Sequence, residues 1–162
     1  FGSTLDPILE RNPCDVIILR NCSQRTYKQI LVPVAGGPHS VLALKTASTL
    51  LDPEDGMVIP INVAPPGKST IDIEEFIAKN VAEMRCRLDR FVPKYVVARD
   101  VLGTLVAEAG NVDLVVVGAT CERRLRQFAT GSLPETLAEK TAFPLVMVKA
   151  RTPVESLVNR WV

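Results

Sequence analysis

The sequence contains a single histidine, His39, and this scarcity limits the chemistry that the chain can perform. A Ser/His/Asp hydrolase would have to be built around that one side chain, and no serine or cysteine lies in a recognisable nucleophile elbow. His39 belongs to the run Gly36-Gly37-Pro38-His39-Ser40, where we expect it to be a polar residue in the first turn of a helix. We therefore expect no catalytic residues of this type.

Cysteine is also used sparingly, without the spacing that metal sites need. Cys14, Cys22, Cys86 and Cys121 include no CxxC pair, and with one histidine they offer no zinc-ligand pattern. Disulfides are uncommon in cytosolic proteins, so reduced thiols are the simplest interpretation. The sequence predicts a cytoplasmic chain without a metal.

The chain also lacks a large net charge and long apolar runs. Nineteen Lys and Arg against eighteen Asp and Glu give a net charge of +1, which provides no general field for nucleic acid or an anionic membrane. No apolar run approaches the ~20 residues that span a bilayer, and residues 1–7 lack the features of a signal peptide. We expect no nucleic-acid partner and only indirect contact with membranes.

The residues that are present predict a packed α/β domain. Hydrophobic residues make up 47% of the 162 residues and charged residues 23%, as in ordinary globular proteins. Apolar β-rich runs alternate with helical patterns, which is typical of a doubly wound, five-stranded, mostly parallel sheet with helices on both faces. Pro60 argues against a central place for its strand unless a bulge absorbs it. The expected strands are residues 29–34, 57–63, 95–98, 112–117 and 145–148, and the expected helices are residues 38–51, 71–91, 101–109 and 132–141.

An internal repeat divides the chain further. When residues 1–19 are laid over residues 130–148, Gly2-Ser3 matches Gly131-Ser132 and the apolar run 16–19 matches 145–148. A period of this size indicates a domain repeat; an ordinary N-terminal extension is the alternative. We interpret residues 1–20 as the last helix and strand of a preceding domain copy, 21–28 as a linker, 29–150 as the complete domain, and 151–162 as an amphipathic tail. The tail either packs on its own domain or docks on another domain or a membrane.

Glycine-containing loops follow two of the predicted strands. Ligands of open parallel sheets bind outside the carboxyl ends of the strands, and Ala35-Gly36-Gly37 and Gly118 lie there. Gly131-Ser132 begins a predicted helix, whose N–H groups and dipole favour an anion such as phosphate. Taken singly, each glycine is better explained as a turn residue than as part of a site. The GxxxxGK[ST] and GxGxxG fingerprints are both absent. Three arginines, Arg123, Arg124 and Arg126, are candidates for the phosphate side of a site or form a solvated charge run.

Three segments together resemble the universal stress protein family. They are residues 30–34 (Ile-Leu-Val-Pro-Val), residues 113–118, and Gly131-Ser132 leading through Glu135 and Leu137 to residues 143–148. The resemblance implies a five-stranded doubly wound sheet related to adenine nucleotide alpha hydrolases. It also implies a homodimer through the last strand. The residues of that dimer edge are Leu145, Val146, Met147 and Val148.

One branch of that family binds ATP with a glycine pattern that this chain matches incompletely. Gly118 and Gly131-Ser132 fit the pattern, but Cys121 occupies its middle glycine and Ala35 replaces the usual aspartate after the first strand. The resemblance therefore implies ATP or AMP as the cofactor, with weakened binding. The candidate nucleotide-binding residues are Pro33, Val34, Ala35, Val63, Gly118, Cys121, Gly131, Ser132 and Leu133.

The function that follows is a non-enzymatic regulatory or stress-response domain acting by association. The loop Ala35-Gly36-Gly37-Pro38 resembles tandem copies fused to membrane transporters, which would hold the domain at the inner face of the membrane. One alternative is a weak nucleotide hydrolase that uses Ser132 or His39. Phosphoryl transfer usually needs a metal held by a carboxylate, and Glu122 is the only carboxylate beside Gly118 or Gly131 in sequence. Another is an interaction module without nucleotide. Residues 145–148 would pair with a second last strand, or with residues 16–19 in cis or exchanged between chains.

Overall fold

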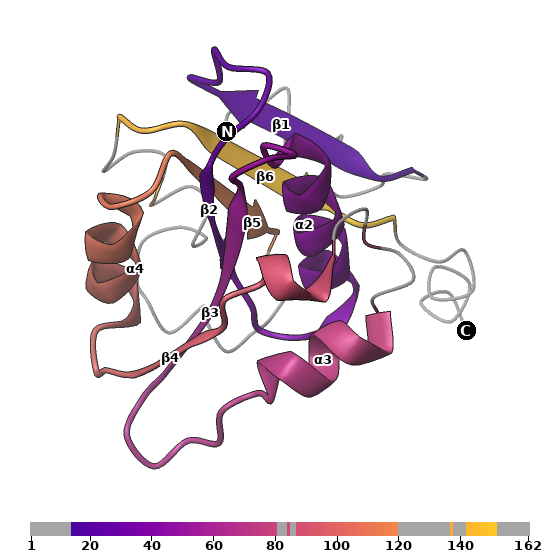
Figure 1. The fold of residues 1–162 in the computed structure, drawn as a ribbon. Coiled ribbons are helices and arrows are strands. Elements are labelled where there is room, and N and C mark those ends of the chain that lie inside the picture. The colour runs from indigo at the N-terminus through magenta and orange to yellow at the C-terminus, as the bar shows by residue number, and fades with distance from the viewer. Residues whose placement is uncertain (1–13, 81–83, 85–86, 120–136, 138–141, 152–162) are drawn as a thin grey trace, which may run out of the picture.

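The computed structural model describes residues 14–80, 84, 87–119, 137 and 142–151, which form one α/β unit (Figure 1). Within this part of the chain, six strands form a sheet in the order β1-β6-β5-β2-β3-β4. Strands β2 to β6 run parallel and β1 is antiparallel to β6, which confirms the predicted mostly parallel sheet. The strands are β1 (Val16–Arg20), β2 (Gln29–Pro33), β3 (Met57–Ala64), β4 (Lys94–Val97), β5 (Leu114–Gly118) and β6 (Leu145–Lys149). The helices are α2 (Gly37–Leu50), α3 (Ile73–Asn80) and α4 (Val101–Ala109).

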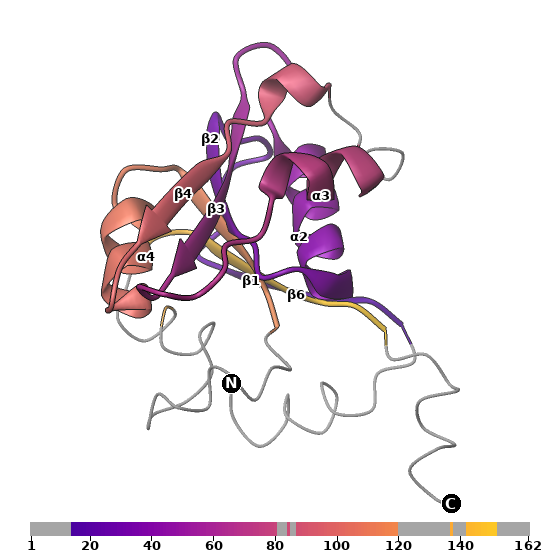
Figure 2. The ribbon, with the colours of Figure 1, turned by 90° about the horizontal axis from the view of Figure 1, so that it is seen from below.

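Helices cover both faces of the sheet. Helices α2 and α3 lie on one face and α4 lies on the other (Figure 2). Each face has its own hydrophobic core: Ile30, Leu44 and Val116 belong to the first, and Leu31, Leu105 and Val115 to the second. Neighbouring residues of one strand thus enter opposite cores, which explains why the central strands read as continuous apolar runs.

Pro60 does not prevent β3 from pairing on both sides. Strand β3 lies between β2 and β4, and Val32 is the partner of Pro60 in the β2 ladder. On the β4 side, an isolated bridge joins Val58 to Phe91 and regular pairing starts only at Ile61. Pro60 falls in the gap between them, where a missing N–H donor costs no ladder bond.

The expectation of one long helix over residues 71–91 is wrong. Helix α3 ends at Asn80, and Met84 and Arg87 lie outside any helix. A 3-10 turn at Leu88–Arg90 then leads to Phe91, which bridges to Val58. Met84 and Phe91 reach the core from outside any helix, whereas Leu88 is exposed.

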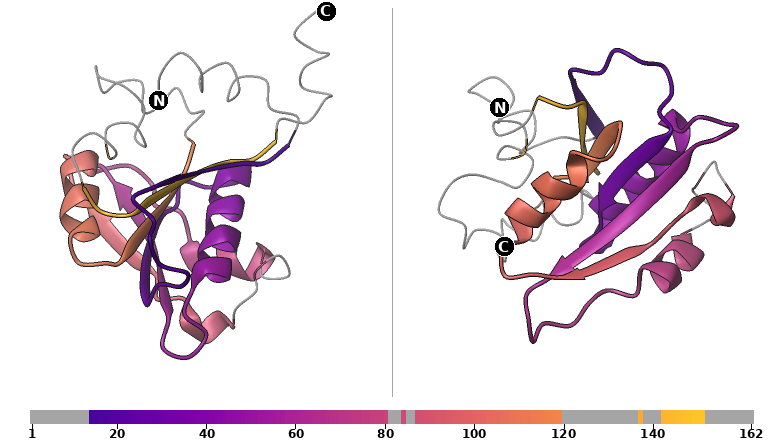
Figure 3. Two further views of the ribbon diagram at one scale, coloured as in Figure 1. Left: turned by 90° about the horizontal axis from the view of Figure 1, so that it is seen from above. Right: turned by 60° about the vertical axis from the view of Figure 1, so that its left-hand side comes forward.

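The repeat segment forms the edge of the sheet. Strand β1 lies beside β6 within the chain (Figure 3). Ile18 pairs with Met147 in this ladder. This agrees with the cis version of the predicted pairing. The predicted helix over residues 132–141 lies outside the described residues except for Leu137, and so does the tail after Arg151. No helix in the described ranges is both long enough and apolar enough to cross a bilayer.

Candidate functional site

The carboxyl ends of β2, β3 and β5 bring the described candidate residues to one edge of the sheet. From β2 the chain continues to β3 and β4 on one side, and it later returns to β5 on the other side of β2. The connections therefore diverge between β2 and β5, the position at which open α/β sheets bind ligands. Pro33 ends β2, and Val34 and Ala35 follow it directly. Val63 lies near the end of β3, and Gly118 ends β5.

Hydrogen bonds fix the backbone where β2 ends. Val34 is buried; its N–H donates to the carbonyl of Ile61 at 2.8 Å, and its carbonyl accepts from Asn62 Nδ2 at 2.8 Å. Asn62 is itself only 8% exposed. A buried carbonyl needs a hydrogen-bond donor. The side-chain amide of Asn62 supplies it and so holds Val34, the residue after β2, against β3.

Ser40 closes the loop that follows. Its Oγ accepts from the Ala35 N–H at 3.3 Å and donates to the Gly36 carbonyl at 2.9 Å. Gly36 and Gly37 have φ of 86° and 75°, a region that favours glycine, so the loop needs both glycines to enter helix α2. Sequence reasoning missed Ser40 and Asn62. The available signals were a hydroxyl four residues after Gly36 and one amide in an otherwise apolar strand.

Ala35 leaves this loop without an acceptor side chain. The residue is exposed at the carboxyl edge of the sheet, where its methyl group can neither accept nor donate a hydrogen bond. Its N–H is already bound to Ser40 Oγ. Position 35 therefore offers a ligand only van der Waals contact and the Ala35 carbonyl.

Gly118 has a structural reason to be glycine. A Cβ at this position would lie 3.0 Å from His39 Cβ and 3.1 Å from the His39 carbonyl carbon and oxygen. The first turn of α2 thus packs directly against the end of β5. Close packing explains this glycine even without a ligand, whereas the alternative considered from the sequence was a turn residue.

His39 lies in the first turn of α2, as expected. Its Nδ1 accepts a hydrogen bond from the Ala150 N–H at 3.0 Å. Partial burial, and then the positive charge of Lys149, lower the pKa of His39 below its usual value. Because Nδ1 accepts, the neutral ring carries its proton on Nε2. This tautomer is a donor at Nε2 and is poorly suited to act as a general base there.

The remaining predicted site residues are only partly described. Cys121, Arg123, Arg124, Arg126, Gly131, Ser132 and Leu133 lie outside the described residues. The predicted dimer-edge residues Leu145, Val146, Met147 and Val148 form β6 and are buried. In the described ranges, no group of three or more His, Cys, Asp or Glu side chains is placed to hold a metal ion.

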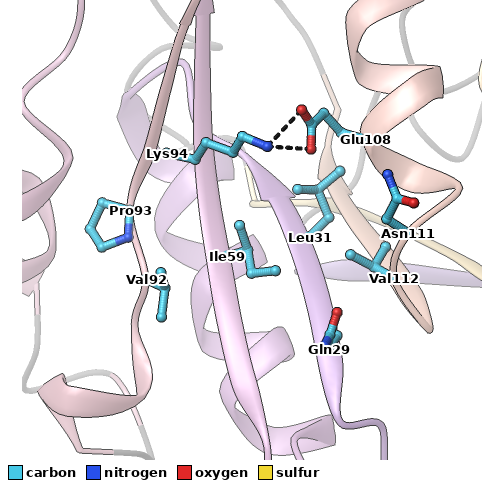
Figure 4. A pocket seen from close by; sticks show the side chains of 9 residues that line it. All are labelled: Gln29, Leu31, Ile59, Val92, Pro93, Lys94, Glu108, Asn111 and Val112. Atoms are coloured by element: carbon cyan, nitrogen blue, oxygen red, sulfur yellow. Dashed lines mark hydrogen bonds and ion pairs between the residues drawn. The ribbon is translucent and has the colours of Figure 1, made fainter.

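A groove of about 340 Å³ lies at the opposite end of the sheet (Figure 4). It runs between the start of β4 and the end of α4. The ion pair of Lys94 Nζ with both Glu108 carboxylate oxygens, at 2.7 Å each, crosses one end of it. Its lining residues are Gln29, Leu31, Ile59, Val92, Pro93, Lys94, Glu108, Asn111 and Val112. The groove is therefore separate from the predicted site.

Known proteins share both the sequence pattern and the fold. The universal stress protein family model matches residues 26–149. A solved universal stress protein in complex with cAMP superposes with a TM-score of 0.57 at 20% identity, covering 77% of this chain and 98% of that one. The universal stress protein from Archaeoglobus fulgidus gives 0.56 at 18% identity, with 76% and 95% covered. A family protein from Burkholderia pseudomallei gives 0.50 at 24%, with 75% and 95% covered. No curated protein sequence matches the chain.

Proposed function

The chain belongs to the universal stress protein family, and from this we propose that it is a non-enzymatic regulatory domain with a low-affinity adenine-nucleotide site. The observation that carries the nucleotide part is the loop Ala35-Gly36-Gly37, held by Ser40 where the strand order diverges beside Gly118. The relative solved with cAMP supports the same ligand class.

The proposed affinity is low because two positions lack features that the family uses for ATP. The Ala35 side chain has no acceptor for the nucleotide, and Cys121 stands in the sequence where the family pattern has a glycine that lets the backbone approach phosphate. A lost hydrogen bond or a strained contact costs about 1–3 kcal/mol each, so together they weaken binding by a factor of tens to thousands.

Mass spectrometry of the purified chain for retained nucleotide, followed by calorimetric titration with ATP, AMP and cAMP, tests this proposal. We expect weak binding, in the range of tens of micromolar or above. The absence of heat with all three would remove nucleotide from the proposal and leave an interaction module. Turnover of ATP with magnesium that disappears in Ser132→Ala would overturn the non-enzymatic part.

We further propose that the domain acts beside another copy of itself, on the basis of the β1–β6 register. In the repeat, Ile18 corresponds to Met147, and these two residues are partners in the sheet. Val16 corresponds to Leu145 and Arg20 to Lys149; Val16 pairs with Lys149 and Arg20 with Leu145. The strand pair thus has a local two-fold axis that coincides with the sequence repeat. That is the arrangement expected when the last strands of two copies meet.

Burial supports the same proposal. Val146 and Val148 are 0% exposed beneath α2, whereas their repeat counterparts Ile17 and Leu19 are 47% and 60% exposed. A preceding copy of the domain would cover these two side chains, and a second chain with its last strand free would do the same.

The proposal includes attachment of the domain to a membrane transporter. The coding sequence upstream of Phe1 tests it: a domain copy preceded by apolar spans is expected, and unrelated sequence would contradict it.

A further inference from the structure

We propose that His39 is a pH-sensitive latch: its neutral ring holds the segment that leaves β6, and its protonation releases that segment together with the start of β1. The geometric basis is the hydrogen bond from the Ala150 N–H to His39 Nδ1 at 3.0 Å. A backbone N–H can only donate, so this bond exists only while Nδ1 keeps its lone pair.

Protonation turns this contact from favourable to unfavourable. In imidazolium both ring nitrogens carry hydrogen, so Nδ1–H would face the Ala150 N–H, donor against donor. Ala150 is 8% exposed, which leaves its N–H little access to water as a replacement acceptor. His39 and Ala150 therefore must separate when the ring is charged.

The surroundings of the ring disfavour its charged form. Burial disfavours an imidazolium, and Lys149 on β6 repels one; both lower the pKa of His39. Asp15, just before β1, uses Oδ1 to accept from the Arg151 N–H at 2.8 Å. The facing end of β5 is Gly118, which carries no charge.

The latch connects two edges of the molecule. Arg151 follows Ala150 directly and is bound to Asp15, and Val16 pairs with Lys149, so release of Ala150 loosens the start of β1. On its other side, the first turn of α2 that carries His39 packs against Gly118 at the candidate nucleotide edge. A change of pH at one residue thus acts on the β1 edge. The latch operates within one chain and requires neither a bound nucleotide nor a second copy of the domain.

The sign of the effect follows from the lowered pKa. The unfolded chain binds a proton at His39 more readily than the folded chain, so this residue stabilises the fold fully above about pH 6.5. That contribution is lost as the pH falls through the folded pKa. Acidification, and not alkalinisation, opens the latch.

Backbone amide exchange of the full ¹⁵N-labelled chain, measured from pH 7.5 to pH 5 and corrected for intrinsic exchange, tests the proposal. We expect the protection of the Ala150 amide to fall about tenfold as the ring titrates, the effect of one lost hydrogen bond. The Ala98 amide, which donates to the Ala64 carbonyl at 3.0 Å at the far edge of the sheet, should not change. Ring ¹⁵N shifts should show the Nε2–H tautomer at pH 7.5.

Two variants separate the latch from general acid sensitivity. His39→Asn retains an acceptor that does not titrate, so the pH dependence at Ala150 should disappear. Lys149→Met removes the neighbouring cation, so the ring titration and the loss of protection should move together to higher pH. Protection of Ala150 that stays constant while the ring titrates, or a midpoint that does not follow the ring in Lys149→Met, would overturn the inference. Either result would leave the proposed function untouched.

Discussion

At the level of single residues, the candidate edge is shaped as much by packing as by ligand chemistry. Gly118 matches a nucleotide-binding pattern in sequence, yet a Cβ at this position would lie only 3.1 Å from the His39 carbonyl group. Ser40 and Asn62, which no sequence motif indicated, hold the loop that carries Ala35. A glycine match alone therefore does not distinguish a binding role from a structural one.

Gly118→Ala should destabilise the fold even when no ligand is present. The new Cβ would meet the His39 carbonyl group at 3.1 Å, and helix backbone moves little, so we expect a loss of about 1–3 kcal/mol. Urea denaturation monitored by circular dichroism measures it. Gly110→Ala is the matched control, because its Cβ would lie 3.4 Å from the nearest atom and its φ is −66°. Equal stability of the two variants would contradict the packing argument.

Ala35→Asp should strengthen nucleotide binding. The substitution places a carboxylate acceptor on the exposed end of β2, where ribose or amino groups of a nucleotide could donate to it. We expect a gain of roughly tenfold in affinity, and more when it is combined with Cys121→Gly. Calorimetry with ATP checks this, with Ala35→Ser as a control that supplies a weaker acceptor. An unchanged affinity in Ala35→Asp would show that ligands do not reach this loop.

At the level of elements, helix α4 shows that the bounds of a short helix can be predicted from the sequence. The sequence predicted residues 101–109, and α4 occupies Val101–Ala109. Gly110 ends it with an ordinary φ of −66°, so the left-handed cap that a glycine usually signals is not used here. The start of the helix is fixed by Asp100, whose Oδ1 accepts from the Gly103 N–H at 2.8 Å.

Asp100→Ala should weaken α4. Loss of an N-terminal cap costs about 0.5–2 kcal/mol, and the Gly103 N–H would turn to water instead. Amide exchange at Gly103 and Thr104, with thermal unfolding of the whole domain, measures the effect. Asp100→Ser keeps an acceptor and should retain most of the stability. If Asp100→Ser were as unstable as Asp100→Ala, the cap would not be the cause.

The long helix predicted over residues 71–91 shows where pattern reading fails. Ile73 and Ile77 belong to α3, but Phe91 reaches the same core from beyond a 3-10 turn. Met84 is also buried outside α3, whereas Leu88 is exposed, so apolar residues at helical spacing did not locate the end of the helix. Beyond α3 the chain brings Phe91 beside Val58.

At the level of the whole molecule, β1 determines what the sheet can bind at its edge. It pairs with β6 on one side, and no strand of the described residues pairs with its other side. The side chains of Ile17 and Leu19, on the face that α2 covers elsewhere, are exposed as well. A sheet edge that is neither paired nor covered favours association with another strand. The state of association of this chain should therefore depend on β1.

Deletion of residues 1–20 should produce a dimer. Without β1, the backbone of β6 is open, and two copies can pair through it about the two-fold axis that the β1–β6 register already has. Multi-angle light scattering at tens of micromolar measures the mass. Deletion of residues 1–13 is the control, because β1 remains. A monomer after the longer deletion would contradict association through the last strand.

The sequence by itself determined the class of fold, five of the strands and the family. These features rest on local periodicity and composition, which burial on both faces of a sheet imposes directly on each segment. The tertiary structure alone decided the register of β1 on β6, the gap that accommodates Pro60, the close contact that requires glycine at position 118, and the hydrogen bond between His39 and Ala150. Each of these joins residues far apart in the chain, so no local pattern carries them.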